Sequence, residues 1–348
     1  MSAAGRHADA LAACQRALGL DPDCADAHYR LGIIRRDLQD FTAAAASYRR
    51  AIALKPDYIE AHNNLGAVFQ LEGRLEEARE CYRRAVELKP DFGAPYMNLG
   101  RLCEILGDRD AAAHCFERAI AANVEPDAFR HLLNAAQGVV TDRAPAAYAR
   151  TVFDNFAADF ERHLVADLGY RIPQILGERV KTLCGPRKLR VLDLGCGTGL
   201  CGASIKDACE LLVGVDLSPA MLARAGERHL YDKLVEMDVA EYLPTLPAAA
   251  FDAVLAADVF IYLGELTEIF TQVARVLAAG GVFAFSIERA NDDRDFALQP
   301  SGRYCQSADY IRRIALGAGF TIALSFDEII RGAPGAGTPG HVYFLQRV

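Results

Sequence analysis

The sequence predicts two domains, an all-α solenoid of helical repeats followed by an α/β domain built on a mostly parallel sheet. Three observations lead to this fold class. In the first third of the chain, a set of residues recurs with a period of 34 positions. Further on, short apolar segments alternate with amphipathic segments, as strands and crossover helices do. Where that alternation begins, glycines cluster in VLDLGCGTGLCG, residues 191–202.

Length and composition are those of a folded protein with about two domains. Hydrophobic residues make up 52% of the 348 and charged residues 24%, so sizeable cores can form. The net charge of −8 argues against a nucleic-acid partner, because binding phosphates requires a basic surface. The ten cysteines include no C-x-x-C pair, and we expect no metal site.

The N-terminal segment favours a cytoplasmic protein. Arg6, Asp9 and Arg16 lie where a signal peptide would need an unbroken apolar core. No uncharged apolar run in the sequence approaches the roughly 18 residues that span a membrane. Scattered cysteines also suit a reducing compartment. We therefore expect no membrane partner.

The repeat is clearest at its prolines. Pro22, Pro56 and Pro90 stand 34 residues apart, and each follows a leucine and a charged residue. Proline cannot continue a helix interior, so it closes the second helix of each hairpin. Other positions keep the same interval: Leu31-Gly32, Leu65-Gly66 and Leu99-Gly100; Ala44, Ala78 and Ala112; Tyr48, Tyr82 and Phe116. Small residues let two helices approach closely, and the aromatic residue fills the space between hairpins.

This arrangement resembles the tetratricopeptide repeat. The resemblance implies three helical hairpins, preceded by a half repeat and followed by a capping helix. The predicted boundaries are 1–137 for the repeat domain, with repeats at 25–58, 59–92 and 93–126, then 138–150 for a linker and 151–348 for the second domain.

The first helix of each hairpin is expected to line a concave groove. Asn64 and Asn98 occupy equivalent positions there, with Arg30 at the same place in the preceding repeat. The Asn-Leu-Gly pattern resembles the asparagine ladder in the repeat domain of O-GlcNAc transferase, in which asparagines hold an extended peptide. The resemblance implies a protein or peptide partner, because an amide both donates to and accepts from a backbone. Solvated asparagines, or repeats that serve self-association, are the alternatives.

The glycine cluster fits two kinds of cofactor. Gly197-x-Gly199-x-x-Gly202 is the turn of a dinucleotide-binding site, and Asp216 stands 19 residues after Gly197, where a carboxylate would bind ribose. Asp193 argues for another ligand, because a carboxylate at the end of the first strand would repel a pyrophosphate. S-adenosylmethionine carries an ammonium and a sulfonium but no phosphate, and it suits that carboxylate.

Two acids follow the next two predicted strands. Asp216 ends VGVD, where it can bind both ribose hydroxyls, and Asp238 ends VEMD, where it can accept from the adenine amino group. Val239 can offer its backbone N–H to the adenine ring. Helix N-caps would account for one or two of these acids, but not for the glycines.

Residues from about 150 to 348 resemble a class I S-adenosylmethionine-dependent methyltransferase, and the whole chain resembles a family of bacterial repeat-containing proteins predicted to be methyltransferases. The resemblance implies a Rossmann-like, seven-stranded sheet whose last two strands form an antiparallel hairpin. FTIALSFDEIIR and GHVYFLQRV are the predicted hairpin strands. The predicted cofactor-binding residues are Asp193, Gly195, Cys196, Gly197, Gly199, Asp216, Leu217, Asp238, Val239, Tyr170 and Arg171.

Asp258 is the predicted catalytic residue. It follows the fourth strand, where it can position the acceptor or remove a proton from it, or simply support the fold. The residues from Asp258 to Ile261 lack the prolines found there in amino-group methyltransferases that act on DNA bases. This difference also argues against a nucleic-acid substrate.

A lid and a substrate side are predicted around this residue. Residues 153–171 are the predicted lid, from which Tyr170 or Arg171 would reach the methionyl carboxylate. Arg303 can bind a carboxylate or a phosphate, or remain a solvated surface residue. The substrate-side residues that we predict are His163, Arg303 and Tyr304.

The sequence favours in-line methyl transfer from S-adenosylmethionine to an unidentified acceptor, with the repeats recruiting a protein or peptide as partner or substrate. A small-molecule methyltransferase whose repeats only mediate self-association is one alternative. A catalytically inactive interaction scaffold and a dehydrogenase are two others. The intact acids and glycines count against the scaffold, and Asp193 counts against the dehydrogenase.

Overall fold

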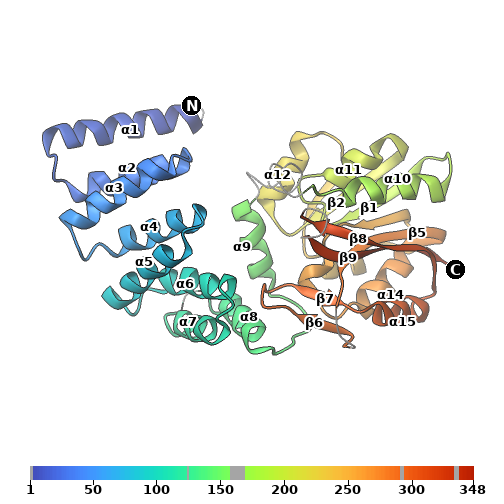
Figure 1. Cartoon of the computed structure of the whole chain (residues 1–348). Helices are drawn as coiled ribbons and strands as arrows, with labels where there is room; N and C mark the ends of the chain where they lie inside the picture. Colours follow the sequence, from blue (N-terminus) through green and yellow to red (C-terminus); the bar gives the residue numbers. More distant parts are fainter. Residues whose placement is uncertain (1–2, 124, 157–168, 291–293, 333–336) are drawn as a thin grey trace. The chain divides into compact units, whose positions relative to one another are not determined.

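The chain is described by a computed structural model that covers residues 3–123, 125–156, 169–290, 294–332 and 337–348 (Figure 1). Its contacts divide it into two compact units, residues 1–137 and 138–348. Among the described residues, no helix combines the length and the apolar character needed to cross a membrane.

The described residues of the first unit form helices joined by short turns, with no strand among them. Each predicted repeat contains one helical hairpin, and α2–α3, α4–α5 and α6–α7 are these pairs. This confirms the helical repeat solenoid. The helices are α1 (Ala3–Leu20), α2 (Ala25–Asp37), α3 (Phe41–Leu54), α4 (Ile59–Leu71), α5 (Leu75–Leu88), α6 (Gly93–Ile105), α7 (Arg109–Ala121) and α8 (Pro126–Gln137).

Close packing inside each hairpin explains the repeated glycines. Tyr48 is fully buried, and a Cβ atom placed on Gly32 would lie 2.5 Å from its Cε1 atom. A Cβ atom on Gly66 would likewise lie 2.7 Å from Cε1 of Tyr82. The aromatic ring therefore occupies the space that a side chain on the facing helix would need.

The second unit contains a sheet of seven strands in the order β3-β2-β1-β4-β5-β9-β8. The first five are parallel, while β9 runs antiparallel to both β5 and β8. This confirms the predicted Rossmann-like sheet with its C-terminal antiparallel hairpin. The strands are β1 (Leu189–Leu194), β2 (Cys209–Asp216), β3 (Lys233–Glu236), β4 (Phe251–Ala256), β5 (Leu277–Glu288), β8 (Phe320–Arg331) and β9 (Thr338–Arg347).

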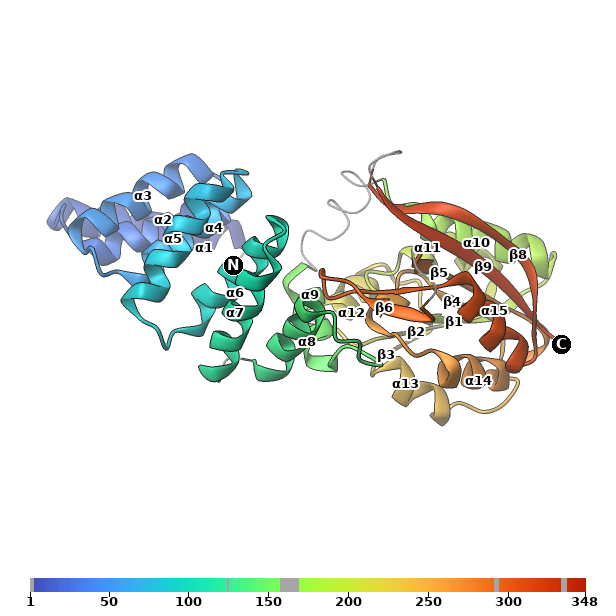
Figure 2. The same cartoon turned by 60° about the horizontal axis from the view of Figure 1, so that its bottom comes forward.

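Helices cover both faces of this sheet. Figure 2 shows α10 and α11 on one side and α13 and α14 on the other. Successive residues of β4 alternate between two apolar clusters, since Ala253 belongs to one and Val254 to the other. The helices are α9 (Ala146–Phe156), α10 (Ile172–Cys184), α11 (Leu200–Ile205), α12 (Pro219–Glu227), α13 (Val239–Tyr242), α14 (Thr267–Val276) and α15 (Ala308–Gly317).

Two features go beyond the sequence prediction. A small antiparallel pair, β6 (Phe296–Leu298) and β7 (Tyr304–Gln306), follows β5. Part of the predicted linker packs against the second unit, where the N–H of Ala144 donates to the Tyr262 carbonyl at 2.9 Å and the N–H of Gly264 donates to the Asp142 carbonyl at 2.8 Å. Residues 141–144 thus form a strap, and we keep this name for them.

Candidate functional site

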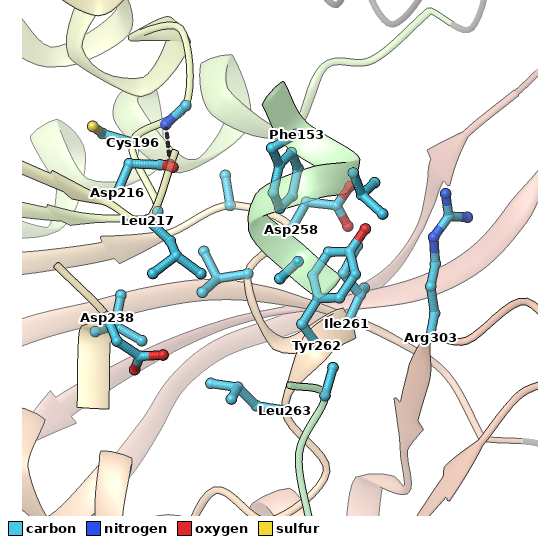
Figure 3. Close-up of a pocket in the computed structure, with 18 of the residues that line it drawn as sticks. Phe153, Cys196, Asp216, Leu217, Asp238, Asp258, Ile261, Tyr262, Leu263 and Arg303 are labelled. Atoms are coloured by element: carbon cyan, nitrogen blue, oxygen red, sulfur yellow. Dashed lines mark hydrogen bonds between the residues drawn. The ribbon is translucent and has the colours of Figure 1, made fainter. Parts of the chain in front are cut away.

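A cavity of about 260 Å³ opens at the carboxyl ends of the parallel strands (Figure 3). This edge is where open α/β sheets bind their ligands. Segments that follow β1, β2, β3 and β4 contribute its walls, together with the strap and α9. The lining residues include Arg143, Phe153, Tyr170, Gly195, Cys196, Gly197, Thr198, Asp216, Leu217, Asp238, Val239, Asp258, Ile261, Tyr262, Arg303 and Arg331.

The turn after β1 depends on its glycines. Gly195, Gly197 and Gly199 have φ values of 60°, 53° and 89°, in the left-handed region that other residues avoid. A Cβ atom on Gly195 would lie 2.6 Å from Cγ2 of Val259, whereas one on Gly197 would project into open space. Glycine therefore makes the turn possible at the first position and leaves the cavity clear at the second.

Asp216 holds this turn and also lines the cavity. Its Oδ2 atom accepts a hydrogen bond of 2.8 Å from the N–H of Gly197, drawn as a dashed line in Figure 3. Its Oδ1 atom accepts one of 2.9 Å from the N–H of Ser218. Burial raises the pKa of Asp216, while these backbone N–H groups oppose the rise.

Asp238 has two partners. Its Oδ1 atom caps α13 by accepting a hydrogen bond of 2.8 Å from the N–H of Ala240. Its Oδ2 atom forms an ion pair with Arg143 of the strap. Arg143 was not among the predicted site residues, because its segment carries no local pattern that distinguishes it from an exposed turn. Only the folding of the strap onto the second unit brings Arg143 to Asp238.

Asp193 lies beneath the glycine turn and is not among the residues that line the cavity. The hydroxyl of Tyr231 donates a hydrogen bond of 2.6 Å to its Oδ2 atom. Burial raises the pKa of Asp193 to about 7, although the Tyr231 hydrogen bond opposes the rise. Asp193 is therefore tied to Tyr231 outside the described cavity lining, and its direct contact with a ligand stays a prediction.

At the other end of the cavity, Asp258 belongs to a buried ionic cluster. Its carboxylate pairs with Arg331 at 2.5 Å, and Arg331 also pairs with Glu288. Burial raises the pKa of Asp258 and of Glu288, while Arg331 opposes both rises. Asp258 has a left-handed φ of 62°, and its N–H donates to the Ser286 hydroxyl at 3.0 Å.

Neither Arg331 nor Glu288 was predicted from the sequence. Each is the charged last residue of an apolar strand. That position is the one sequence feature that could have marked them as candidate site residues. Their pairing connects β5 with β8, which lie on either side of β9 in the sheet. The two residues lie 43 positions apart in the sequence, so no local pattern predicts that they pair.

The other predicted site residues fall into three groups. Tyr170, Cys196, Leu217, Val239 and Arg303 line the cavity. Arg171 is exposed and lies outside the lining, and Tyr304 is buried behind it with its hydroxyl 2.6 Å from the hydroxyl of Thr141. His163 lies outside the described residues, as does most of the predicted lid.

In the repeat unit, both predicted groove asparagines contact the neighbouring repeat. Nδ2 of Asn64 donates to the Tyr29 hydroxyl at 3.1 Å, and Nδ2 of Asn98 donates to Oδ1 of Asn63 at 2.9 Å. These hydrogen bonds connect α2 with α4 and α4 with α6. The asparagines thus link consecutive repeats along one face of the solenoid.

The described part of the chain contains no group of three or more His, Cys, Asp or Glu side chains arranged to hold a metal ion. The polar groups that line the cavity include carboxylates, the guanidinium groups of three arginines, tyrosine hydroxyls and the Thr198 hydroxyl. That hydroxyl is buried and, within the described ranges, has no hydrogen-bond partner. An organic ligand with donors and acceptors of its own suits such a set better than a cation does.

Comparison with known protein families assigns both units. The family described as "Methyltransferase domain" matches residues 192–285, which include the glycine turn and Asp258. The chain combines tetratricopeptide repeats with a methyltransferase domain. Three repeat families match residues 34–73, 59–92 and 94–123 of the first unit. Tetratricopeptide repeats are in general protein-interaction modules.

Curated relatives of the methyltransferase domain act on diverse molecules. The chain is 30% identical to malonyl-[acyl-carrier protein] O-methyltransferase of Geobacter sulfurreducens over 145 residues, which are 40% of this chain and 52% of that protein. It is 36% identical to 18S rRNA (guanine-N(7))-methyltransferase of Bos taurus over 85 residues, which are 24% of this chain and 30% of that protein. The matched segments thus span about a third to a half of these relatives.

Solved structures with a similar fold include the [4+2]-cyclase SpnF. It covers 60% of this chain and 98% of its own, with a TM-score of 0.49 and 18% identity. A second is the 1,6-didemethyltoxoflavin-N1-methyltransferase of Burkholderia thailandensis, solved with bound 1,6-didemethyltoxoflavin and S-adenosylhomocysteine. It covers 60% of this chain and 92% of its own, with a TM-score of 0.47 and 19% identity.

Proposed function

We propose that this protein is an S-adenosylmethionine-dependent methyltransferase and that the cavity of the second unit binds the cofactor. The observation that carries the proposal is that Asp216 and the glycine turn lie side by side in the cavity wall. A buried carboxylate at the end of β2 faces the cavity directly beside a turn whose glycines leave room for a ligand. The family match over residues 192–285 supports the same activity.

The residues present fit the parts of this cofactor. Asp216 would accept hydrogen bonds from the ribose hydroxyls, and Asp238 with the N–H of Val239 would recognise adenine. The space over Gly197 and the unpartnered hydroxyl of Thr198 suit the polar methionyl part. When bound, the cofactor supplies an electrophilic methyl group on a sulfonium.

The protein's own contribution to the transfer would be positioning. The methyl group moves by in-line displacement: the acceptor's lone pair forms the new bond to carbon while the carbon–sulfur bond breaks, and its electron pair stays on sulfur. Phe153, Ile261 and Tyr262 line the opposite end of the cavity and would exclude water from that step. Asp258 would orient the acceptor there and would take up a proton if the acceptor carries one.

The repeats would bind a protein or peptide, either a partner or the substrate. Asn64 and Asn98 are the proposed contacts, since they occupy equivalent positions in consecutive repeats, and an amide oxygen can accept a second hydrogen bond, as Oδ1 of Asn64 would beside its 3.5 Å contact with Nδ2 of Asn63. Self-association through the same repeats is the competing role. Gel filtration with light scattering would separate the two, because self-association predicts a dimer that persists without any other protein.

Calorimetric titration of the full chain tests the cofactor. We expect S-adenosylmethionine and S-adenosylhomocysteine to bind and NAD not to bind. Asp216→Ala should weaken both by more than about tenfold, because a buried carboxylate that accepts from hydroxyl groups is lost. Glu210→Ala is the matched control, since Glu210 lies on the same strand but is exposed.

Three results would contradict the proposal. Binding of NAD alone would make the protein an oxidoreductase. Absence of binding by folded protein would favour an interaction scaffold. Equal affinities for the wild type and Asp216→Ala would place the cofactor elsewhere.

A further inference from the structure

Arg303 is held at the acceptor end of the cavity by a tight hairpin. It lies between β6 and β7, where the N–H of Gln299 donates to the Arg303 carbonyl at 2.7 Å. Gln306 of β7 is fully buried and donates to the carbonyls of Phe260 and Leu263 at 3.0 Å and 2.7 Å. The backbone that carries Arg303 is thus fastened to the segment that carries the cavity wall.

Among the described residues, three arginines line the cavity, and they differ in their partners. Arg143 pairs with Asp238, and Arg331 pairs with both Asp258 and Glu288. Within the described ranges, Arg303 has no carboxylate oxygen within the 4.0 Å of an ion pair. Its charge acts on three neighbouring groups: burial raises the pKa of Tyr262, Asp258 and Glu288, and Arg303 opposes each of these rises.

Figure 3 shows that Arg303, Tyr262 and Asp258 lie together, across the cavity from Asp216 and Asp238. The surrounding walls are apolar and aromatic, with Phe153 and Tyr262 in edge-to-face contact at 5.3 Å between ring centres. A guanidinium beside apolar walls binds a carboxylate through two parallel hydrogen bonds. A carboxylate is favoured over a phosphate dianion, because Arg331 is already paired with Asp258 and Glu288 and the single charge of Arg303 balances one negative charge rather than two.

We propose that Arg303 binds a carboxylate of the methyl acceptor, and that the acceptor is a small organic acid with an apolar or aromatic body. The inference rests on the proposed function, since it assigns the second substrate of the same cavity. Arg303, predicted on the substrate side, would thus bind a carboxylate. Tyr304, predicted there as well, would instead support the hairpin that carries Arg303.

The test is ligand-observed NMR titration of the full chain saturated with S-adenosylhomocysteine. The cofactor product fills its own subsite, so an added acid cannot bind where the methionyl carboxylate would lie. The probes are benzoate, the neutral benzamide and the phenyl phosphate dianion. We expect benzoate to bind about tenfold or more tightly than benzamide, and more tightly than phenyl phosphate.

Variants separate a direct contact from a general effect of charge. Arg303→Gln should weaken benzoate by about tenfold or more and leave S-adenosylhomocysteine affinity unchanged, while Arg303→Lys should retain part of the affinity. Arg312→Gln is the matched control, because Arg312 is exposed on α15 and pairs only with Asp309 among the described residues.

Several outcomes would overturn the inference. They are equal binding of benzoate and benzamide, unchanged benzoate binding by Arg303→Gln, tighter binding of phenyl phosphate, and no benzoate binding by wild-type protein that holds S-adenosylhomocysteine. If S-adenosylhomocysteine itself fails to bind, the proposed function fails and this inference fails with it.

Discussion

Arg331 bridges two carboxylates from different strands, Asp258 after β4 at 2.5 Å and Glu288 at the end of β5. All three side chains are close to 10% exposed, so water screens the pairs weakly. The cluster fixes the acceptor end of the cavity, because Asp258 and Arg331 both line it. Arg331 forms ion pairs with both carboxylates, and Arg303 adds a weaker favourable charge nearby.

Replacing Arg331 should destabilise the protein in a pH-dependent way. Arg331→Gln leaves two buried carboxylates without a partner, which costs about 3–5 kcal/mol. Burial raises the pKa of both groups in the folded state, and removing Arg331 raises them further. Protonation relieves the repulsion, so the loss should be smaller at low pH than at high pH. Urea unfolding at pH 5 and pH 8 measures the difference.

Arg289→Gln is the control for the Arg331 variant. Arg289 pairs with Asp327, but both side chains are at least half exposed, and the expected loss is below about 1 kcal/mol at either pH. An Arg331→Gln loss that did not change with pH would contradict the electrostatic account of the cluster.

A second pH effect should come from Asp193. Burial raises its pKa from 3.8 to about 7, so between these values the folded state holds a proton that the unfolded state has released. The free energy of unfolding therefore falls as the pH rises through this window. Asp193→Asn should remove that contribution, and its stability relative to wild type should increase from pH 4 to pH 8. A constant difference across the range would show that Asp193 keeps an ordinary pKa.

Asp238 should have separable structural and binding roles. Asp238→Ala removes the cap that accepts from Ala240, and about 1 kcal/mol of stability should be lost. Asp238→Asn retains an oxygen for the cap but loses the negative charge beside Arg143. We expect this variant to keep its melting temperature while binding S-adenosylhomocysteine more weakly in calorimetry. If both variants lowered the melting temperature equally, the ion pair with Arg143, rather than the cap, would stabilise the N-terminus of α13.

The repeat glycines offer a matched pair of substitutions. Gly66→Ala places a methyl group 2.7 Å from the Tyr82 ring, and we expect a loss of about 1–3 kcal/mol from overpacking. Gly19→Ala, in α1, meets nothing within 4 Å and should stabilise the helix by about 0.5–1 kcal/mol. Urea unfolding followed by circular dichroism at helix wavelengths measures both. Similar effects for the two variants would contradict the packing explanation.

Local patterns account for what the sequence could predict. The period of 34 residues identifies the helical hairpins because each repeat must present the same small and aromatic residues to the next. Alternation of strands and helices predicts the parallel sheet, and its strand ends predict where Asp216, Asp238 and Asp258 lie. These inferences need only residues that are close together along the chain.

The sequence by itself therefore determined the two architectures and the edge of the sheet at which the cavity opens. The tertiary structure alone decided the pairing of Arg331 with Asp258, the contact between the strap and Asp238, and the hydrogen bond between Tyr231 and Asp193. These depend on side chains that meet across 73, 95 and 38 residues of chain, respectively. Two charges attract according to their distance in space. A repeat period or a local motif does not specify which distant segments the packing of a sheet brings together, so these pairs could not be predicted from the sequence.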